Sequence, residues 1–233
     1  MLTLKGTALD VAVGVVRRGL DALLPEGEAF AKIVDPKALN IAEAMCEHFD
    51  ANIRTKNNQQ MRVALAAFDV AHFFADGFPT SSDFINKFAT TIGSEIFVPE
   101  TILAGDGKRL IALLAHECEH VVQFKKHGFV MPWWYLTSSE ERAGYEANAY
   151  GAGQDVLHEM GWPMPAKVED VAPSLVTSYH LQPEDVQLAT NMLRSHLASV
   201  GHHVHTTDAA KFALSQIELY APEWLVQIGR AHV

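Results

Sequence analysis

The sequence has few cysteines, no long apolar run and no excess of positive charge. Its two cysteines, Cys46 and Cys118, are too few for a disulfide framework, so we expect reduced thiols. No apolar run approaches the ~20 residues that a membrane span requires. The short apolar patch near the N-terminus is interrupted by Asp10 and precedes its arginines, an order that is not typical of a signal peptide. We therefore expect a cytoplasmic or assembly-associated protein without a membrane span.

The charge balance narrows the classes of partner. The chain has 28 acidic and 18 basic residues, which gives a formal net charge of -10. Nucleic acids and anionic membrane surfaces require a basic binding surface, so we expect neither as a partner. With 233 residues, of which 48% are hydrophobic, the chain is long enough to bury a substantial core.

Helical periodicity dominates the pattern of apolar residues, and one segment is typical of a strand. The sequence predicts a mainly helical α+β fold with one small antiparallel sheet. We divide the chain into a helical N-terminal segment (1–86), a metal-binding core (87–165) and a helical C-terminal segment (166–233), packed as one compact unit. The expected strand covers 90–100, and the expected helices outside the core cover 8–24, 38–54, 61–75, 183–200 and 207–220.

The stretch LIALLAHECEHVVQF places two histidines and a glutamate in an apolar segment. Asp106 and Gly128 are suitable end residues for a buried helix over 107–127. His116 and His120 are four residues apart, so their imidazoles project from one face and can reach one zinc ion. Glu117 is offset by about 100° and is placed to act on a metal-bound water. The pattern H-E-x-x-H therefore predicts a zinc site.

A catalytic zinc requires a third protein ligand. Lys126 occupies the position of the third histidine in the extended H-E-x-x-H-x-x-G-x-x-H motif, so that class is excluded. A predicted helix over 137–161, opened by a capping box at Ser138 and Glu141, supplies the alternative. Glu146 lies two turns into it and is our candidate ligand; Glu140 and Glu141 remain alternatives. A stripe of small residues beside Glu146 favours a close approach to the metal helix. The stripe consists of Ala143, Ala147 and Gly151.

HECEHVVQF followed by YLTSSEERAGYEANAY resembles the zinc core of gluzincin metallopeptidases, over about 90–160. The resemblance implies a zincin-like core in which Glu117 is the general base and acid. It also implies that Glu146, with Ala149 at i+3, is the third zinc ligand. The strand that precedes the metal helix, about 92–98, is then the rim of the cleft and pairs with an extended peptide. Many gluzincins have an aspartate at the position of Tyr150, where it holds a zinc-bound histidine, so here a phenol or a backbone carbonyl takes that role.

The function expected from these features is zinc-dependent hydrolysis of a peptide bond, with Glu117 activating a zinc-bound water. The alternative is a zinc-binding scaffold within a larger assembly, such as a virion or a secretion particle. A di-iron bundle requires E-x-x-H on two helices, and this chain has it once. The histidines of the tract 202–205 predict a solvated loop. The residues of suitable chemistry to stabilise the oxyanion are Tyr135, Tyr145, Tyr150, His158, Tyr179 and His180.

Overall fold

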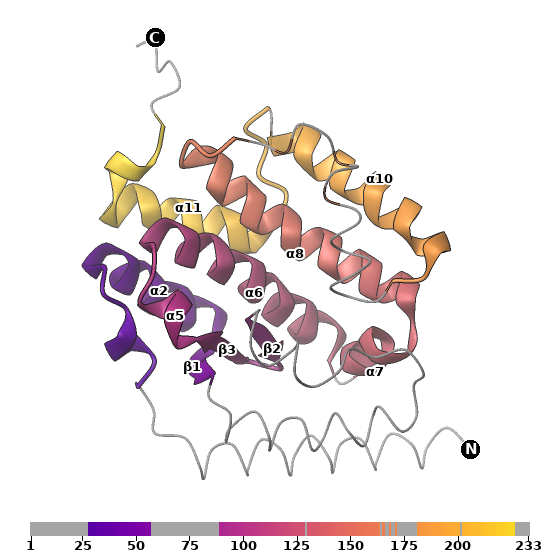
Figure 1. The fold of residues 1–233 in the computed structure, drawn as a ribbon, viewed down its shortest axis with the longest axis horizontal. Helices are drawn as coiled ribbons and strands as arrows, with labels where there is room; N and C mark the ends of the chain where they lie inside the picture. The colour runs from indigo at the N-terminus through magenta and orange to yellow at the C-terminus, as the bar shows by residue number, and fades with distance from the viewer. Residues whose placement is uncertain are drawn as a thin grey trace.

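A computed structural model describes residues 28–56, 89–128, 130–163, 165, 168, 171, 181–200 and 202–226. Figure 1 shows these residues as a group of helices with a small sheet on one side. The predicted helices at 8–24 and 61–75 lie outside the described residues. The helices are α2 (Pro36–Phe49), α5 (Glu100–Leu103), α6 (Gly107–His127), α7 (Val130–Thr137), α8 (Ser139–Glu159), α10 (Pro183–Val200) and α11 (Asp208–Tyr220). The strands are β1 (Asn52–Lys56), β2 (Thr90–Ile92) and β3 (Glu95–Pro99), and the 3₁₀ turns are η1 (Phe30–Lys32) and η3 (Pro222–Trp224).

The predicted helix over 38–54 is present as far as Phe49, and the prediction is wrong for its last five residues. Helix α2 begins after Asp35, whose side chain accepts hydrogen bonds from two backbone amides of the first turn, and it ends at Phe49. Asp50 then adopts a left-handed conformation with φ 45°, which stops the helix where the sequence has no glycine. The next residues form β1, whose pairing partner is more than 40 residues away, at Glu95.

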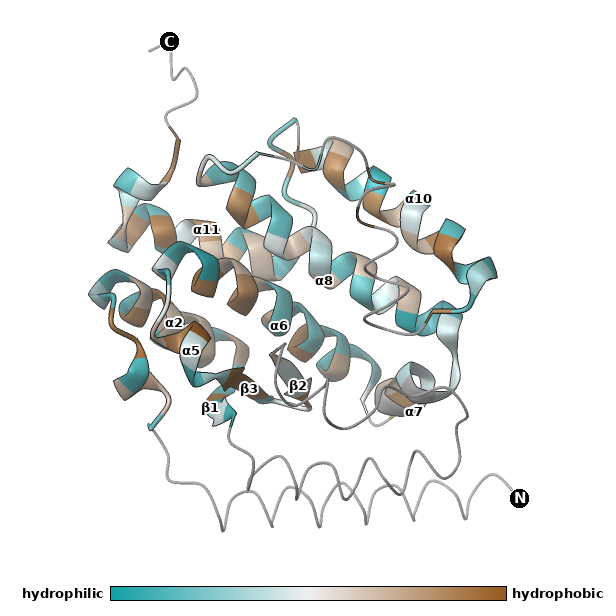
Figure 2. Ribbon diagram, viewed as in Figure 1, coloured by the Kyte–Doolittle hydropathy of each residue, from teal (hydrophilic) through white to brown (hydrophobic). Residues whose placement is uncertain are grey.

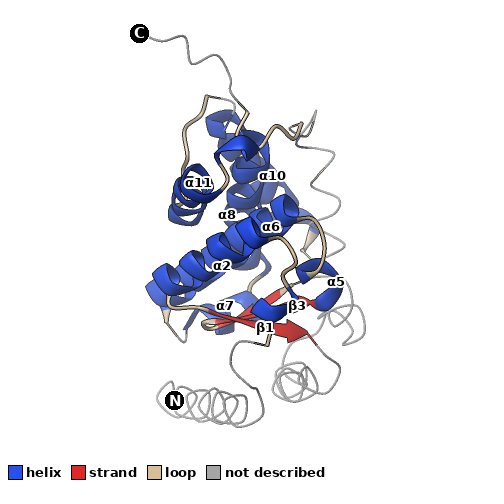
Figure 3. Ribbon diagram, turned by 90° about the vertical axis from the view of Figure 1, so that its left-hand side faces the viewer, coloured by secondary structure: helices blue, strands red, loops and turns tan. Residues whose placement is uncertain are grey.

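The sheet is mixed: one of its two strand pairs is antiparallel, as expected, and the other is parallel. The strand predicted over 90–100 is a hairpin, because Gly93, with φ 65°, turns the chain between β2 and β3. Strand β3 is central: β2 pairs with it antiparallel, and β1 pairs with it parallel. Figure 3 shows the three strands along one side of the helices. The rim strand expected at 92–98 thus has both edges occupied along much of its length.

Helix α6 has the bounds that its end signals predict. The side chain of Asp106 accepts a hydrogen bond from the amide of Arg109, and Gly128, with φ 61°, ends the helix. Because α6 packs against α2, α8, α11 and the sheet, most of its residues are buried. Brown, apolar residues gather in Figure 2 where α2, α6 and α11 face one another. Helix α6, which carries the two histidines of the predicted zinc site, therefore lies in the middle of the main core.

The helix predicted over 137–161 is present as α8, and a separate short helix, α7, precedes it. Ser138 is the N-cap of α8 and accepts a hydrogen bond from the amide of Glu141. Helix α7 has the sequence VMPWWYLT, which contains a proline near its start and has no periodic polar face. The sequence therefore gave little indication that this segment is helical.

The small-residue stripe of α8 does not face the metal helix. Ala143 and Ala147 belong to a second core cluster with residues of α10, and a Cβ on Gly151 would lie 2.8 Å from the ring of His196. Helix α6 instead approaches α8 at Gly153, where a Cβ would lie 3.1 Å from the carbonyl oxygen of Ala112. The small residues thus allow close packing on two sides of α8, and Gly153 is the one next to the metal helix.

The C-terminal helices were predicted well. Helix α10 has the expected bounds, and α11 begins at Asp208, one residue later than expected, after its N-cap Thr207. Helix α10 packs on α8, whereas α11 packs on α2, α6 and α8. Among the helices in the described ranges, none combines the length and apolar character that crossing a membrane requires.

Candidate metal centre

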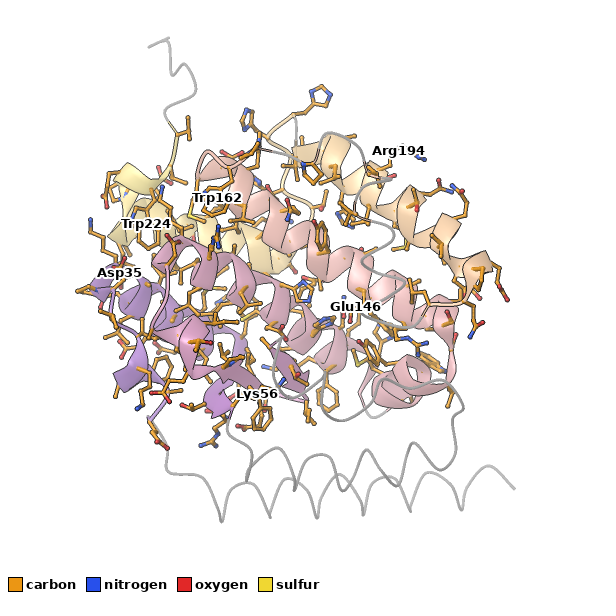
Figure 4. All side chains as sticks on the ribbon, in the orientation of Figure 1. Asp35, Lys56, Glu146, Trp162, Arg194 and Trp224 are labelled. Carbon is orange, nitrogen blue, oxygen red and sulfur yellow. The ribbon has the colours of Figure 1, made fainter. Side chains whose placement is uncertain are left out.

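The structure brings together the three residues predicted as zinc ligands. One potential donor atom from each of His116, His120 and Glu146 lies within 4.8 Å of the others. The Nε2 atom of His116 is 3.7 Å from Oε2 of Glu146, and Nε2 of His120 is 3.5 Å from Oε1. In Figure 4, Glu146 lies between α6 and α8. Ligands at about 2.0–2.2 Å around a tetrahedral zinc are separated by similar distances, so the three donors can share one ion with little movement.

Glu146 is the most buried member of the cluster, with 1% of its surface exposed. Its Oε1 accepts a hydrogen bond from the hydroxyl of Tyr135 at 2.5 Å, whereas its Oε2 is buried and has no hydrogen-bond partner in the part of the chain that the structure describes. Burial raises the pKa of Glu146, but the two imidazoles and the phenol outweigh burial and hold the pKa below its ordinary value. An ionised, buried carboxylate oxygen without a donor requires a compensating group, and a cation is a suitable one.

Tyr135 is fixed from a second direction. Nη1 of Arg142 donates to the backbone carbonyl of Tyr135 at 2.6 Å, and its guanidinium lies 6.0 Å from the centre of the tyrosine ring. Arg142 lies four residues before Glu146, a spacing at which the two charges can pair on a helix surface. Instead, Arg142 contacts Tyr135, and Glu146 points into the cluster.

His120 is oriented by a residue that sequence reasoning missed. Nε2 of Gln123 donates a hydrogen bond to the carbonyl of Tyr145 at 3.0 Å. The amide oxygen Oε1 of Gln123 therefore faces Nδ1 of His120 at 2.9 Å and accepts a hydrogen bond from it. This contact leaves Nε2 of His120 directed at Glu146. Burial lowers the pKa of His120, but Glu146 and other polar neighbours outweigh burial and raise the pKa above its ordinary value. A bond from the second ring nitrogen to an oxygen is the usual way in which proteins orient metal-binding histidines.

His116 lies next to the backbone of α8. Burial lowers the pKa of His116 overall, although Glu117, Glu146 and the backbone carbonyl of Ala149 act in the opposite direction. Of the two partners that the sequence allowed at this point, a backbone carbonyl is the one that acts on the imidazole. Tyr150 packs against the second core cluster instead, and burial raises its pKa. A neutral imidazole is the form that binds a metal.

Glu117 lies beside the cluster but is not a member of it. It is 4% exposed, and its Oε2 accepts a hydrogen bond from the hydroxyl of Thr91, on β2, at 2.7 Å. Lys56, at the end of β1, donates a hydrogen bond to the hydroxyl of Thr90 at 3.0 Å. Burial lowers the pKa of Lys56 to about 8, although the negative charge of Glu117 acts to raise it. The sheet thus positions the expected base and places a basic group near it.

The remaining candidates from the sequence lie elsewhere. Glu140 and Glu141 are exposed on the first turn of α8. Tyr145 packs its ring against His127, and His158 stacks on His203 near the far end of α8. Tyr179 and His180 lie outside the described residues. Of the described candidates for stabilising an oxyanion, Tyr135 is the one hydrogen-bonded to the cluster.

Sequence reasoning missed Gln123, Thr91 and Lys56. Gln123 lies three residues after His120, one helical turn away, and that spacing is a signal that was available. Thr91 and Lys56 reach the site only through the pairing of the three strands, so no local pattern indicates them. Comparison of the chain with protein-family models, with curated proteins and with solved structures gives no match.

Proposed function

We propose that the protein is a zinc-dependent hydrolase of peptide bonds. The observation that carries the proposal is the donor set itself: two histidines from α6 and a buried glutamate from α8, with one carboxylate oxygen that has no hydrogen-bond partner among the described residues. Two histidines and one glutamate form a ligand set of catalytic zinc sites, in which a fourth position stays open for water or substrate. Within the described residues the cluster has three members, which supports this arrangement over a closed structural site of four protein ligands.

A zinc ion in this position supplies an acidified water and polarises the carbonyl group of the substrate. Glu117 then accepts the proton of the attacking water and delivers it to the amine that leaves. Its second oxygen is held by Thr91, so the side chain is oriented before substrate binds. This division of work explains why Glu117 lies next to the ligands, 4% exposed, without being one of them.

Tyr135 is the residue that we assign to the developing oxyanion. Its hydroxyl already lies at the cluster, against Oε1 of Glu146, and Arg142 fixes its backbone and ring. When Glu146 coordinates a metal, the hydroxyl of Tyr135 can donate its hydrogen bond to an oxygen of the substrate in place of Glu146. A donor placed in advance at this point stabilises charge that develops in the transition state.

The extended substrate runs along β2 in this proposal and not along β3. Strand β3 is paired on both sides over Glu95–Phe97, so most of the expected stretch Ile96–Val98 is not available to a peptide. Strand β2 is the one that contacts the base through Thr91, and within the described residues it pairs only with β3. A strand edge next to the base offers backbone hydrogen bonds to an extended chain.

Metal content of single variants tests the ligand set. Glu146→Ala should contain one zinc ion fewer per chain than wild type, while Glu140→Ala and Glu141→Ala, on exposed positions of the same helix, serve as controls and should contain as much zinc as wild type. Elemental analysis after exhaustive dialysis measures the zinc. A zinc content of Glu146→Ala equal to that of wild type would refute the assignment.

A further inference from the structure

A second cluster of side chains that could bind a metal lies at the C-terminal half of α8. One potential donor atom from each of Asp155, Glu159 and His205 lies within 4.8 Å of the others. The two acids are four residues apart on α8, and the histidine comes from the loop between α10 and α11. The loop at 202–205 is largely exposed, as expected, but two of its histidines have carboxylate partners that the sequence did not indicate.

Hydrogen bonds hold this cluster together. Nδ1 of His205 is 2.8 Å from Oδ1 of Asp155, and Nδ1 of His203 is 2.6 Å from Oε1 of Glu159. The loop bends sharply to make both contacts, since His203 adopts a left-handed conformation with φ 55°. His158 stacks on His203. Two separate histidine–carboxylate contacts in one short loop form an organised site.

The position of the two carboxylates is unfavourable without a cation. Like charges at i and i+4 destabilise a helix, and negative charge near a helix C-terminus opposes the helix dipole. Asp155 is also only 1% exposed, so burial raises its pKa, against the opposing effect of His205. A divalent cation neutralises both carboxylates at once, and a nitrogen donor beside two oxygen donors suits a zinc-type ion.

We propose that Asp155, Glu159 and His205 form a second site for a divalent transition-metal cation. The side chain of His203 orients Glu159 through its hydrogen bond, in the manner of groups that support metal-binding carboxylates. The bound ion fastens the α10–α11 loop to α8, the helix that also carries Glu146. The site therefore stabilises the helix that positions the first centre, and the inference does not depend on the proposed hydrolase activity.

Cobalt and zinc titrations of a chain without the first centre test this site. Glu146→Ala removes a ligand of the first cluster. We expect this variant to bind one Zn²⁺ or Co²⁺ per chain, at the second cluster, and its Tm to be higher with the metal than without it. Adding Asp155→Asn should weaken that binding at least about tenfold and abolish the rise in Tm. The matched control adds Glu140→Gln, an exposed change on the same helix, and should bind as Glu146→Ala does.

Two results would overturn the proposal. Either Glu146→Ala binds no metal while retaining its helical circular dichroism, or the added Asp155→Asn leaves metal binding unchanged. The contacts around Asp155 would then be ion pairs only. If Asp155→Asn disturbs folding, His205→Gln, at a half-buried loop position, provides the same comparison. Failure of the first centre is recognised separately, because wild type and Glu146→Ala would then bind equal amounts of metal.

Discussion

Replacing Gln123 by leucine tests whether the contact behind His120 tunes the metal centre. The change removes the acceptor for the buried Nδ1 of His120, and the carbonyl of Tyr145, within helix α8, loses its side-chain donor. A buried polar group that loses its partner costs about 1–3 kcal/mol, so the free energy of unfolding of the metal-free protein should fall by that amount. The imidazole also loses the bond that sets its tautomer and orientation, which typically costs 10–100-fold in metal affinity.

The two effects of this substitution are measured separately. Urea unfolding of the metal-free protein gives the stability change, and competition with a chelator of known affinity gives the zinc affinity. Gln123→Glu is the informative companion, because it keeps an acceptor for His120 but loses the donor to Tyr145. It should retain more zinc affinity than Gln123→Leu. A zinc affinity for Gln123→Leu within about twofold of wild type, with the fold intact, would refute this account of His120.

Two further predictions follow from buried titratable groups. Burial raises the pKa of Cys46 to about 12 and the pKa of Cys118 well above its ordinary value. Iodoacetamide at pH 8 should therefore label neither thiol until urea unfolds the chain. Labelling of Cys118 in the native protein would contradict its burial. The pKa of Lys56 falls from 10.5 to about 8 on folding, so between these pH values the unfolded chain binds more protons than the folded chain. The contribution of Lys56 to stability therefore rises with pH over this range, and this contribution is lost as the pH falls through 8. The difference in unfolding free energy between wild type and Lys56→Met should therefore change across this range in urea titrations, and a constant difference would contradict the shift.

Local signals were sufficient to predict helix α6 and the three side chains that the structure brings together as a possible metal site. Asp106 and Gly128 mark the ends of α6, and both act there in the structure. The i, i+4 spacing of the histidines is a property of any helix, so their common face could be predicted without tertiary information. Glu146 was chosen because the site needed a third donor, and α8 places it beside the two imidazoles.

Features that depend on distant residues could not be predicted. Strand β1 was interpreted as the end of a helix, because its reason to be extended is the pairing with β3 more than 40 residues away. The small residues of α8 indicated close packing but not which helix approaches, and Gly153, rather than the expected stripe, faces α6. The partners of His203 and His205 are likewise more than 40 residues away in sequence.

Turnover of peptides by wild type and Glu117→Gln tests the central claim most directly. The zinc-loaded proteins are incubated with a diverse peptide library, with and without a chelator, and cleavage is followed by mass spectrometry. The amide keeps the shape of the side chain but cannot accept a proton, so Glu117→Gln should retain zinc and fold while turnover falls by about 10²–10⁴-fold. Cleavage by wild type should also stop when the chelator is added. The account is contradicted if wild type cleaves nothing and holds its zinc with four protein ligands, or if Glu117→Gln cleaves at the wild-type rate.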